Sequence, residues 1–85
     1  MLNEEQIIVK DALELVAASG TAGVLKSKLL SSLRTPDGQP LSPEQQGVIF
    51  GILTGRTWIV GHIDPLWHNT RWCLTTAGSM ALEAM

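Results

Sequence analysis

The run WIVGHIDPLWHNTRWCLT, residues 58–75, decides the fold of this chain. Residues 58–63 are mostly aromatic or β-branched, which is typical of a strand, and residues 71–75 have the same character. Asp64-Pro65 interrupts the pattern, so we expect two strands joined by a tip at residues 66–69. The run therefore predicts a β-hairpin.

The expected position of the turn also sets the pairing of the two strands. If the turn is centred near Leu66 and Trp67, Gly61 lies opposite Trp72. A glycine at that position would give the indole room on the sheet.

Helical patterns come before this run. Residues 4–18 carry apolar side chains at helical spacing, with Asn3 and Gln6 forming a capping-box pattern at the start. A second helix is expected at about 22–33, with Thr21 as its cap and a row of leucines as its apolar face. Two helices are therefore predicted before residue 34.

A loop rich in Pro, Asp and Gly over residues 34–40 separates these helices from a third. Ser42-Pro43 places a capping residue before a proline, so the third helix should run from about 43 to 54. Its predicted buried side is Val48, Ile49, Ile52 and Leu53.

A short helix is expected after the hairpin. Thr76 is the predicted cap of a helix over residues 77–84, and this helix should return Met80 and Leu82 to the core. The order of elements predicts one mainly helical α+β domain over residues 1–85. Its expected architecture is a winged helix, with a three-helix bundle, a two-stranded hairpin wing and a short C-terminal helix.

The end of the chain resembles a known family of regulators. Trp58-Ile59-Val60, then Asp64-Pro65, then Arg71, then Leu74-Thr75-Thr76-Ala77-Gly78 is similar to the wing of MarR-type and related winged-helix proteins. The resemblance implies that Arg71 enters the minor groove or holds phosphate, that Asp64 orients it, and that the third helix reads the major groove. The chain lacks the long terminal helices through which MarR-type proteins dimerise.

Composition and charge set broad limits. The 85 residues are 45% hydrophobic and only 16% charged, so we expect a surface that favours a protein partner or a second copy of the chain. The net charge is −2, but residues 26–71 hold five Lys and Arg against three acids. Cys73 is the single cysteine and no apolar run is long enough for a membrane span, so a cytoplasmic protein without membrane contact is expected.

Catalytic and metal sites are not predicted. His62, His68 and Cys73 lack the paired spacing of zinc ligands, and no hydroxyl lies near a recognisable His and acid set. Phosphate-loop and dinucleotide patterns are absent from the sequence. We therefore expect neither enzyme activity nor a cofactor.

The leading hypothesis from the sequence is a small winged-helix protein that binds double-stranded DNA, as a transcriptional regulator or an accessory factor. It places contacts on the wing, at the start of the third helix and along the second helix. The predicted DNA contacts are Ser27, Lys28, Arg34, Gln45, Gln46, His68 and Arg71.

The third helix also supports a second hypothesis. Gly47, Gly51 and Gly55 recur every four residues on the side opposite the apolar face, and glycines cannot reach base edges. Such a row permits close approach by another part of the fold, by a protein partner or by a DNA backbone. The alternative function is a protein-interaction module. Its predicted contacts are Gly47, Phe50, Gly51 and Trp67.

Overall fold

The computed structural model describes residues 4–85. Helices make up most of this part of the chain and a small antiparallel sheet completes it, which confirms the predicted mainly helical α+β class. In chain order the elements are α1 (Glu4–Ala18), a 3-10 turn η1 (Gly20–Ala22), β1 (Val24–Leu25), α2 (Lys26–Ser32), α3 (Pro43–Gly55), β2 (Ile59–Ile63), β3 (Thr70–Leu74) and α4 (Thr76–Ala84). The bounds of α1 match the prediction, while its proposed cap, Asn3, lies outside the described residues.

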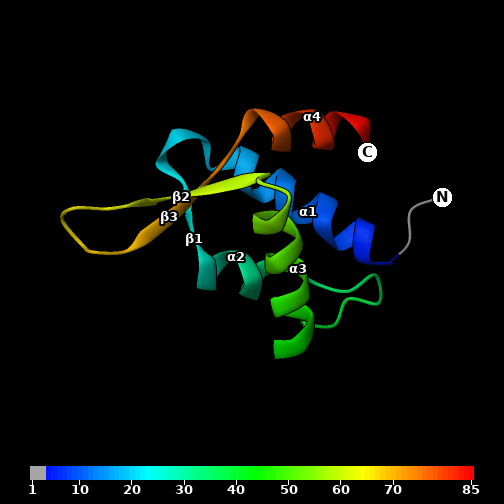
Figure 1. Ribbon diagram of the computed structural model, residues 1–85. Helices are drawn as coiled ribbons and strands as arrows, with labels where there is room; N and C mark the ends of the chain where they lie inside the picture. The colour runs from blue at the N-terminus through cyan, green and yellow to red at the C-terminus, as the bar shows by residue number, and fades with distance from the viewer. Residues whose placement is uncertain (1–3) are drawn as a thin grey trace.

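The first three helices pack around one apolar core, and the hairpin of β2 and β3 projects from them to one side (Figure 1). Helix α4 lies over α1 on the other side of the molecule from α2 (Figure 1). The largest fully buried side chains come from α1, α2, α3 and the loop after α2. They are Leu13, Val16, Leu29, Leu33 and Leu53.

The sheet has three strands in the order β1-β3-β2. The predicted hairpin is its β2–β3 pair, and the third strand, β1, was not predicted. Val24 and Leu25 pair antiparallel with Trp72 and Arg71. Gly23 brings the chain to this strand with a positive φ of 76°. A Cβ at Gly23 would lie 2.9 Å from the Cβ of Arg71, so the close approach of β1 to β3 requires a glycine here.

The same strand displaces the predicted start of the second helix. Helix α2 begins at Lys26 rather than near residue 22, and Thr21 lies inside the 3-10 turn instead of capping α2. Of the leucines predicted for its apolar face, Leu29, Leu30 and Leu33 are buried. The fourth, Leu25, lies in β1 and is half-buried. Pairing with β3 therefore keeps Val24 and Leu25 extended, although the local sequence pattern predicts a helix there.

The predicted strand register of the hairpin is confirmed. Gly61 pairs with Trp72, and the ladder runs from Ile59 opposite Leu74 to Ile63 opposite Thr70. A Cβ at residue 61 would lie 3.2 Å from two atoms of the Trp72 indole. The glycine therefore makes room for this ring, as expected from the sequence.

Helix α3 begins as predicted at Pro43. The Ser42 hydroxyl accepts a hydrogen bond from the Gln45 backbone N–H at 3.2 Å, and the Gln45 side-chain oxygen accepts one from the Ser42 N–H at 2.9 Å. Ile49 and Leu53 are buried, but the prediction for Val48 was wrong because its side chain is 52% exposed. Ile52, also predicted for the buried side, is half-buried and packs against the core.

Helix α4 is capped by Thr75 rather than by Thr76, since the Thr75 hydroxyl accepts from the Gly78 N–H at 3.0 Å. Leu82 packs against the core as predicted. Met80 does not, because 65% of its surface is exposed. No helix within residues 4–85 has the length and apolar character needed to cross a membrane.

Candidate nucleic-acid interface

A polar groove opens where α2, α3 and β3 meet, and we call it the hairpin groove. The elements that line it meet where the hairpin projects from the helices (Figure 1). Its lining residues are Leu25, Lys26, Ser27, Leu30, Ser31, Gln46, Asn69, Thr70 and Trp72. Six of these nine side chains carry a hydroxyl, amide or ammonium group, and none is acidic.

A row of three side chains, one from each element, joins two lining residues of this groove, Lys26 and Trp72, through Phe50. The Lys26 ammonium lies over the Phe50 ring, 4.5 Å from its centroid. Phe50 in turn meets the Trp72 indole edge to face, with centroids 4.9 Å apart. These contacts fix α2 and α3 against β3. Phe50 is therefore half-buried inside the fold rather than free as an interface anchor.

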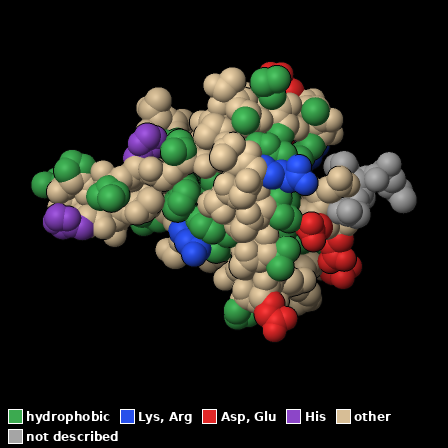
Figure 2. Space-filling view, viewed as in Figure 1, with side chains coloured by type: hydrophobic (Ala, Val, Ile, Leu, Met, Phe, Trp, Pro, Cys, Tyr) green, Lys and Arg blue, Asp and Glu red, His purple; other side chains and the backbone are tan. Residues whose placement is uncertain are grey.

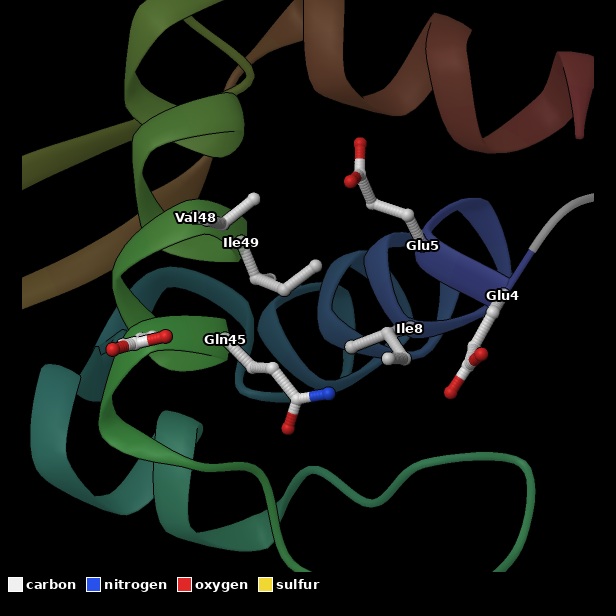
Figure 3. Close-up of a pocket in the computed structure, with 7 residues that line it drawn as sticks. Glu4, Glu5, Ile8, Gln45, Val48 and Ile49 are labelled. Carbon is white, nitrogen blue, oxygen red and sulfur yellow. The ribbon is translucent and has the colours of Figure 1, made fainter.

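The two glutamines predicted to contact DNA lie on different sides of α3. Gln46 lines the hairpin groove. Gln45 points instead into a hollow between α3 and the start of α1, beside Ile8 and the carboxylates of Glu4 and Glu5 (Figure 3). Because these carboxylates repel phosphate, the side of α3 that carries Gln46 is the better suited to a nucleic acid.

The predicted contacts on α2 and just after it are also separated. Ser27 lines the groove, while Lys28 lies along a hollow formed with α1 residues such as Leu15 and Ala18. Arg34 lies near Asp11 and Glu14, and its guanidinium donates to the Ser31 and Leu33 carbonyls at 2.6 and 2.9 Å. Lys28 and Arg34 are therefore not brought together with Ser27.

Side chains of β3 alternate between the two faces of the sheet, and this alternation separates Arg71 from the groove. Thr70 and Trp72 face the groove, whereas the Cβ of Arg71 lies beside Gly23. The Arg71 guanidinium is 3.7 Å from the Asp64 carboxylate, in agreement with the orienting role that the resemblance implies for Asp64.

Asp64 also organises the tip of the hairpin. Its carboxylate accepts hydrogen bonds from the Leu66 and Trp67 backbone N–H groups at 2.9 and 3.3 Å. His68 completes the turn with a positive φ of 57°. The tip therefore holds Leu66, Trp67 and His68 in the solvent, where Leu66 is 75% and Trp67 is 67% exposed.

The glycine row of α3 is open. A Cβ at Gly47, Gly51 or Gly55 would have no neighbour within 4 Å, so no other part of the described chain packs over the row. Of the three possibilities for this row, close approach by another part of the fold is therefore not seen in the described residues. Trp67 does not share a surface with them, since the hairpin tip points away from α3 (Figure 1).

Charge is distributed unevenly over the surface. Acidic side chains cluster near the start of α1 and at the start of α3, while a Lys or Arg side chain lies in the angle between the hairpin and α3 (Figure 2). The hairpin itself carries histidines and apolar side chains (Figure 2). The hollow lined by Glu4, Glu5 and Glu44 is therefore separate from the groove.

Sequence reasoning missed four polar residues of the groove, namely Lys26, Ser31, Asn69 and Thr70. Asn69 and Thr70 follow the predicted contact His68 directly and share the hairpin end with it. Lys26 was not among the predicted DNA contacts. Its place in the groove depends on β1, which sets where α2 begins.

The described residues hold no cluster of three His, Cys, Asp or Glu side chains that could bind a metal ion. His62 and Cys73 border one hollow on the far face of the sheet, while His68 lies at the hairpin tip. No family model, curated protein or solved structure matches this chain.

Proposed function

We propose that this chain is a winged-helix protein that binds double-stranded DNA through the hairpin groove. The order α1-β1-α2-α3-β2-β3, with β2 and β3 as a projecting wing, supports a winged helix. In such a domain α3 approaches a groove of the duplex, and the wing lies along the neighbouring backbone.

The composition of the hairpin groove is the observation that carries the proposal. Hydroxyl and amide side chains from α2, α3 and the wing converge there with one ammonium group. Most protein–DNA hydrogen bonds go to phosphate and sugar, and side chains of these kinds make them. Two of the hollows beside α1, by contrast, contain acidic side chains, namely Glu4, Glu5 and Glu44 in one and Asp11 and Glu14 in the other.

The groove residues take different roles in this proposal. Lys26 neutralises a phosphate, and Phe50 beneath it holds the ammonium in place. Ser27 and Thr70 donate to the backbone on either side of the groove. Gln46, on the turn of α3 that borders the groove, is the side chain placed to reach a base edge.

The open glycine row is compatible with this mode of binding. Because Gly47 and Gly51 project no side chain, α3 can approach a duplex backbone closely. The affinity of a single small module is then low and depends on salt, since few phosphates are neutralised.

The test is titration of the full chain into a random-sequence duplex, followed by fluorescence anisotropy at low and then moderate salt. We expect binding that weakens with salt. Lys26→Gln should weaken it about threefold to tenfold and reduce the salt slope by about one. Lys28→Gln is the matched control, because Lys28 lies on the same helix but outside the groove. Absence of binding at low salt, or equal losses in both variants, contradicts the proposal.

A second proposed function is a protein-interaction module, which the exposed Trp67 and the uncovered glycines favour. Phe50 does not join such a surface, because it packs between Lys26 and Trp72. The hairpin tip and the α3 face would then contact a partner separately. Pull-down with the full chain that survives high salt and is lost in Trp67→Ala, but not in Lys26→Gln, supports this alternative.

A further inference from the structure

Strand β2 forms an open edge of the sheet. It pairs with β3 on one side, and no described strand lies on its other side. Its residues 59–63 read Ile-Val-Gly-His-Ile and contain no Lys, Arg, Asp, Glu or Pro. Soluble proteins usually protect an edge with a charge, a proline or a covering element. Strand β2 has neither a charged residue nor a proline. Its side chains are also accessible, since Val60 is 42% exposed and Ile63 is 73% exposed.

The hydrogen bonds at the two ends of the hairpin show which backbone groups face outward. The Asp64 N–H donates to the Asn69 carbonyl at 2.7 Å, and the Thr75 N–H donates to the Trp58 carbonyl at 3.0 Å. In an antiparallel ladder, hydrogen-bonded pairs alternate with pairs that are not hydrogen-bonded. Val60 and His62 therefore bond to β3. The N–H and C=O groups of Ile59, Gly61 and Ile63 point out of the sheet.

We propose that the edge of β2 binds β2 of a second copy of this chain, antiparallel and with Gly61 opposite the partner's Gly61. In this register Ile59 lies opposite the partner's Ile63, so every outward N–H of each strand meets an outward C=O. A shift by two residues toward the hairpin tip sets Ile59 opposite the partner's Pro65, which has no N–H. The Gly61-centred register thus satisfies the most hydrogen bonds.

The side chains of β2 are also compatible with pairing to β2 of a second copy. Ile59, Gly61 and Ile63 lie on one face of the sheet, while Val60 and His62 lie on the other. Pairing sets each exposed Ile63 beside the partner's Ile59, and each exposed Val60 beside the partner's His62. No Lys, Arg, Asp or Glu side chains meet across the contact, because β2 contains none.

The symmetry of this contact sets how the two hairpin grooves are arranged toward DNA, a consequence that rests on the proposed function. Antiparallel pairing of two identical strands places the two-fold axis perpendicular to the sheet. Both copies of Thr70 and Trp72, and so both hairpin grooves, then open on the same face of a six-stranded sheet. A duplex can engage both grooves, which gives the larger interface that specific binding needs.

The dimer is tested without DNA, so its failure is separate from failure of DNA binding. Sedimentation equilibrium of the full chain should show a monomer–dimer equilibrium. Ile63→Pro removes an outward N–H and the exposed isoleucine side chain, but no hydrogen bond to β3. Proline is tolerated at such an edge position, so the monomer should keep its circular dichroism spectrum. We expect the dimer dissociation constant to rise about tenfold or more.

Val60→Lys should have a similar effect by placing a charge on the edge. Val48→Lys is its matched control, because Val48 is a comparably exposed valine on α3, at 52% against 42%. A chain that stays monomeric at millimolar concentration overturns the proposal. A dimer that neither edge variant weakens also overturns it, because the contact then lies on another surface.

Hydrogen exchange locates the contact residue by residue. The amides of Val60 and His62 should be protected at every concentration, because they bond to β3. The amides of Ile59, Gly61 and Ile63 should gain protection only as the dimer forms. If rising protein concentration changes the exchange protection of both groups of amides equally, the proposed pairing is contradicted.

Discussion

Gly61 lies directly across the sheet from Trp72, and a methyl group in its place would overlap both the indole and the Thr70 side chain. A Cβ at residue 61 would be 2.8 Å from Thr70 Cγ2 and 3.2 Å from the nearest indole carbons. We therefore expect Gly61→Ala to destabilise the protein by about 1–3 kcal/mol, because the indole and the Thr70 side chain must move. Thermal unfolding followed by circular dichroism measures this loss. An unchanged melting temperature contradicts this packing.

A larger loss is expected at Gly78. This glycine is buried at the start of α4, where an added Cβ would collide with the Trp58 carbonyl oxygen. Because the obstacle is backbone rather than a flexible side chain, Gly78→Ala should cost more than Gly61→Ala. Chemical denaturation measures the free energy of unfolding of both variants. A larger loss in Gly61→Ala than in Gly78→Ala rules out this explanation.

Gly47→Ala should have the opposite sign. The position is inside α3, has helical backbone and has open space where a Cβ would lie. Replacement should stabilise the isolated protein by about 0.4–1 kcal/mol, since glycine costs more backbone entropy on folding. The denaturation midpoint should rise. A fall would mean that something covers this face after all.

Much of the fold follows from local sequence. Ser42-Pro43 predicts the start of α3, and the hairpin pattern predicts the pairing of Gly61 with Trp72, because caps and turns depend on neighbouring residues. The strand Val24–Leu25 could not be predicted in this way. Its partner in β3 is far along the chain, and only tertiary pairing makes these residues extended.

The site was less predictable than the fold for the same reason. Gln45 and Gln46 are neighbours in sequence, but one helical step turns them to different sides of α3. Lys26 joins Gln46 only because β1 fixes the start of α2. Residue type indicated polar contacts, but the arrangement of three elements decided which of them meet.

Gly51→Arg separates the two proposed functions. Nothing lies within 4 Å of the place a Cβ would take at this position, so the fold should accept the side chain. If α3 faces DNA, the added charge should tighten binding to random-sequence duplex several-fold and steepen its salt dependence. If α3 faces a protein, the same residue should block the contact. Fluorescence anisotropy with DNA detects the tighter binding expected in the first case. Pull-down at high salt detects the loss of the partner expected in the second.

Asp64 is expected to act on the hairpin tip mainly as a hydrogen-bond acceptor. Asp64→Asn keeps an oxygen for the Leu66 and Trp67 N–H groups and loses only the partly exposed ion pair with Arg71, so stability should change little. Asp64→Ala removes both bonds and should cost about 1 kcal/mol. Exchange of the Leu66 and Trp67 amides should accelerate only in the alanine variant.

The pairing of Val24 with Trp72 also bears on how the molecule is made. Ribosomal synthesis proceeds from the N-terminus, so α1 and α2 are complete long before the strand that anchors the segment preceding α2. Until Trp72 has emerged, that segment has no strand to pair with and α2 has no fixed beginning. Contacts of such long sequence separation slow folding, so closure of the sheet should limit the folding rate of this small domain.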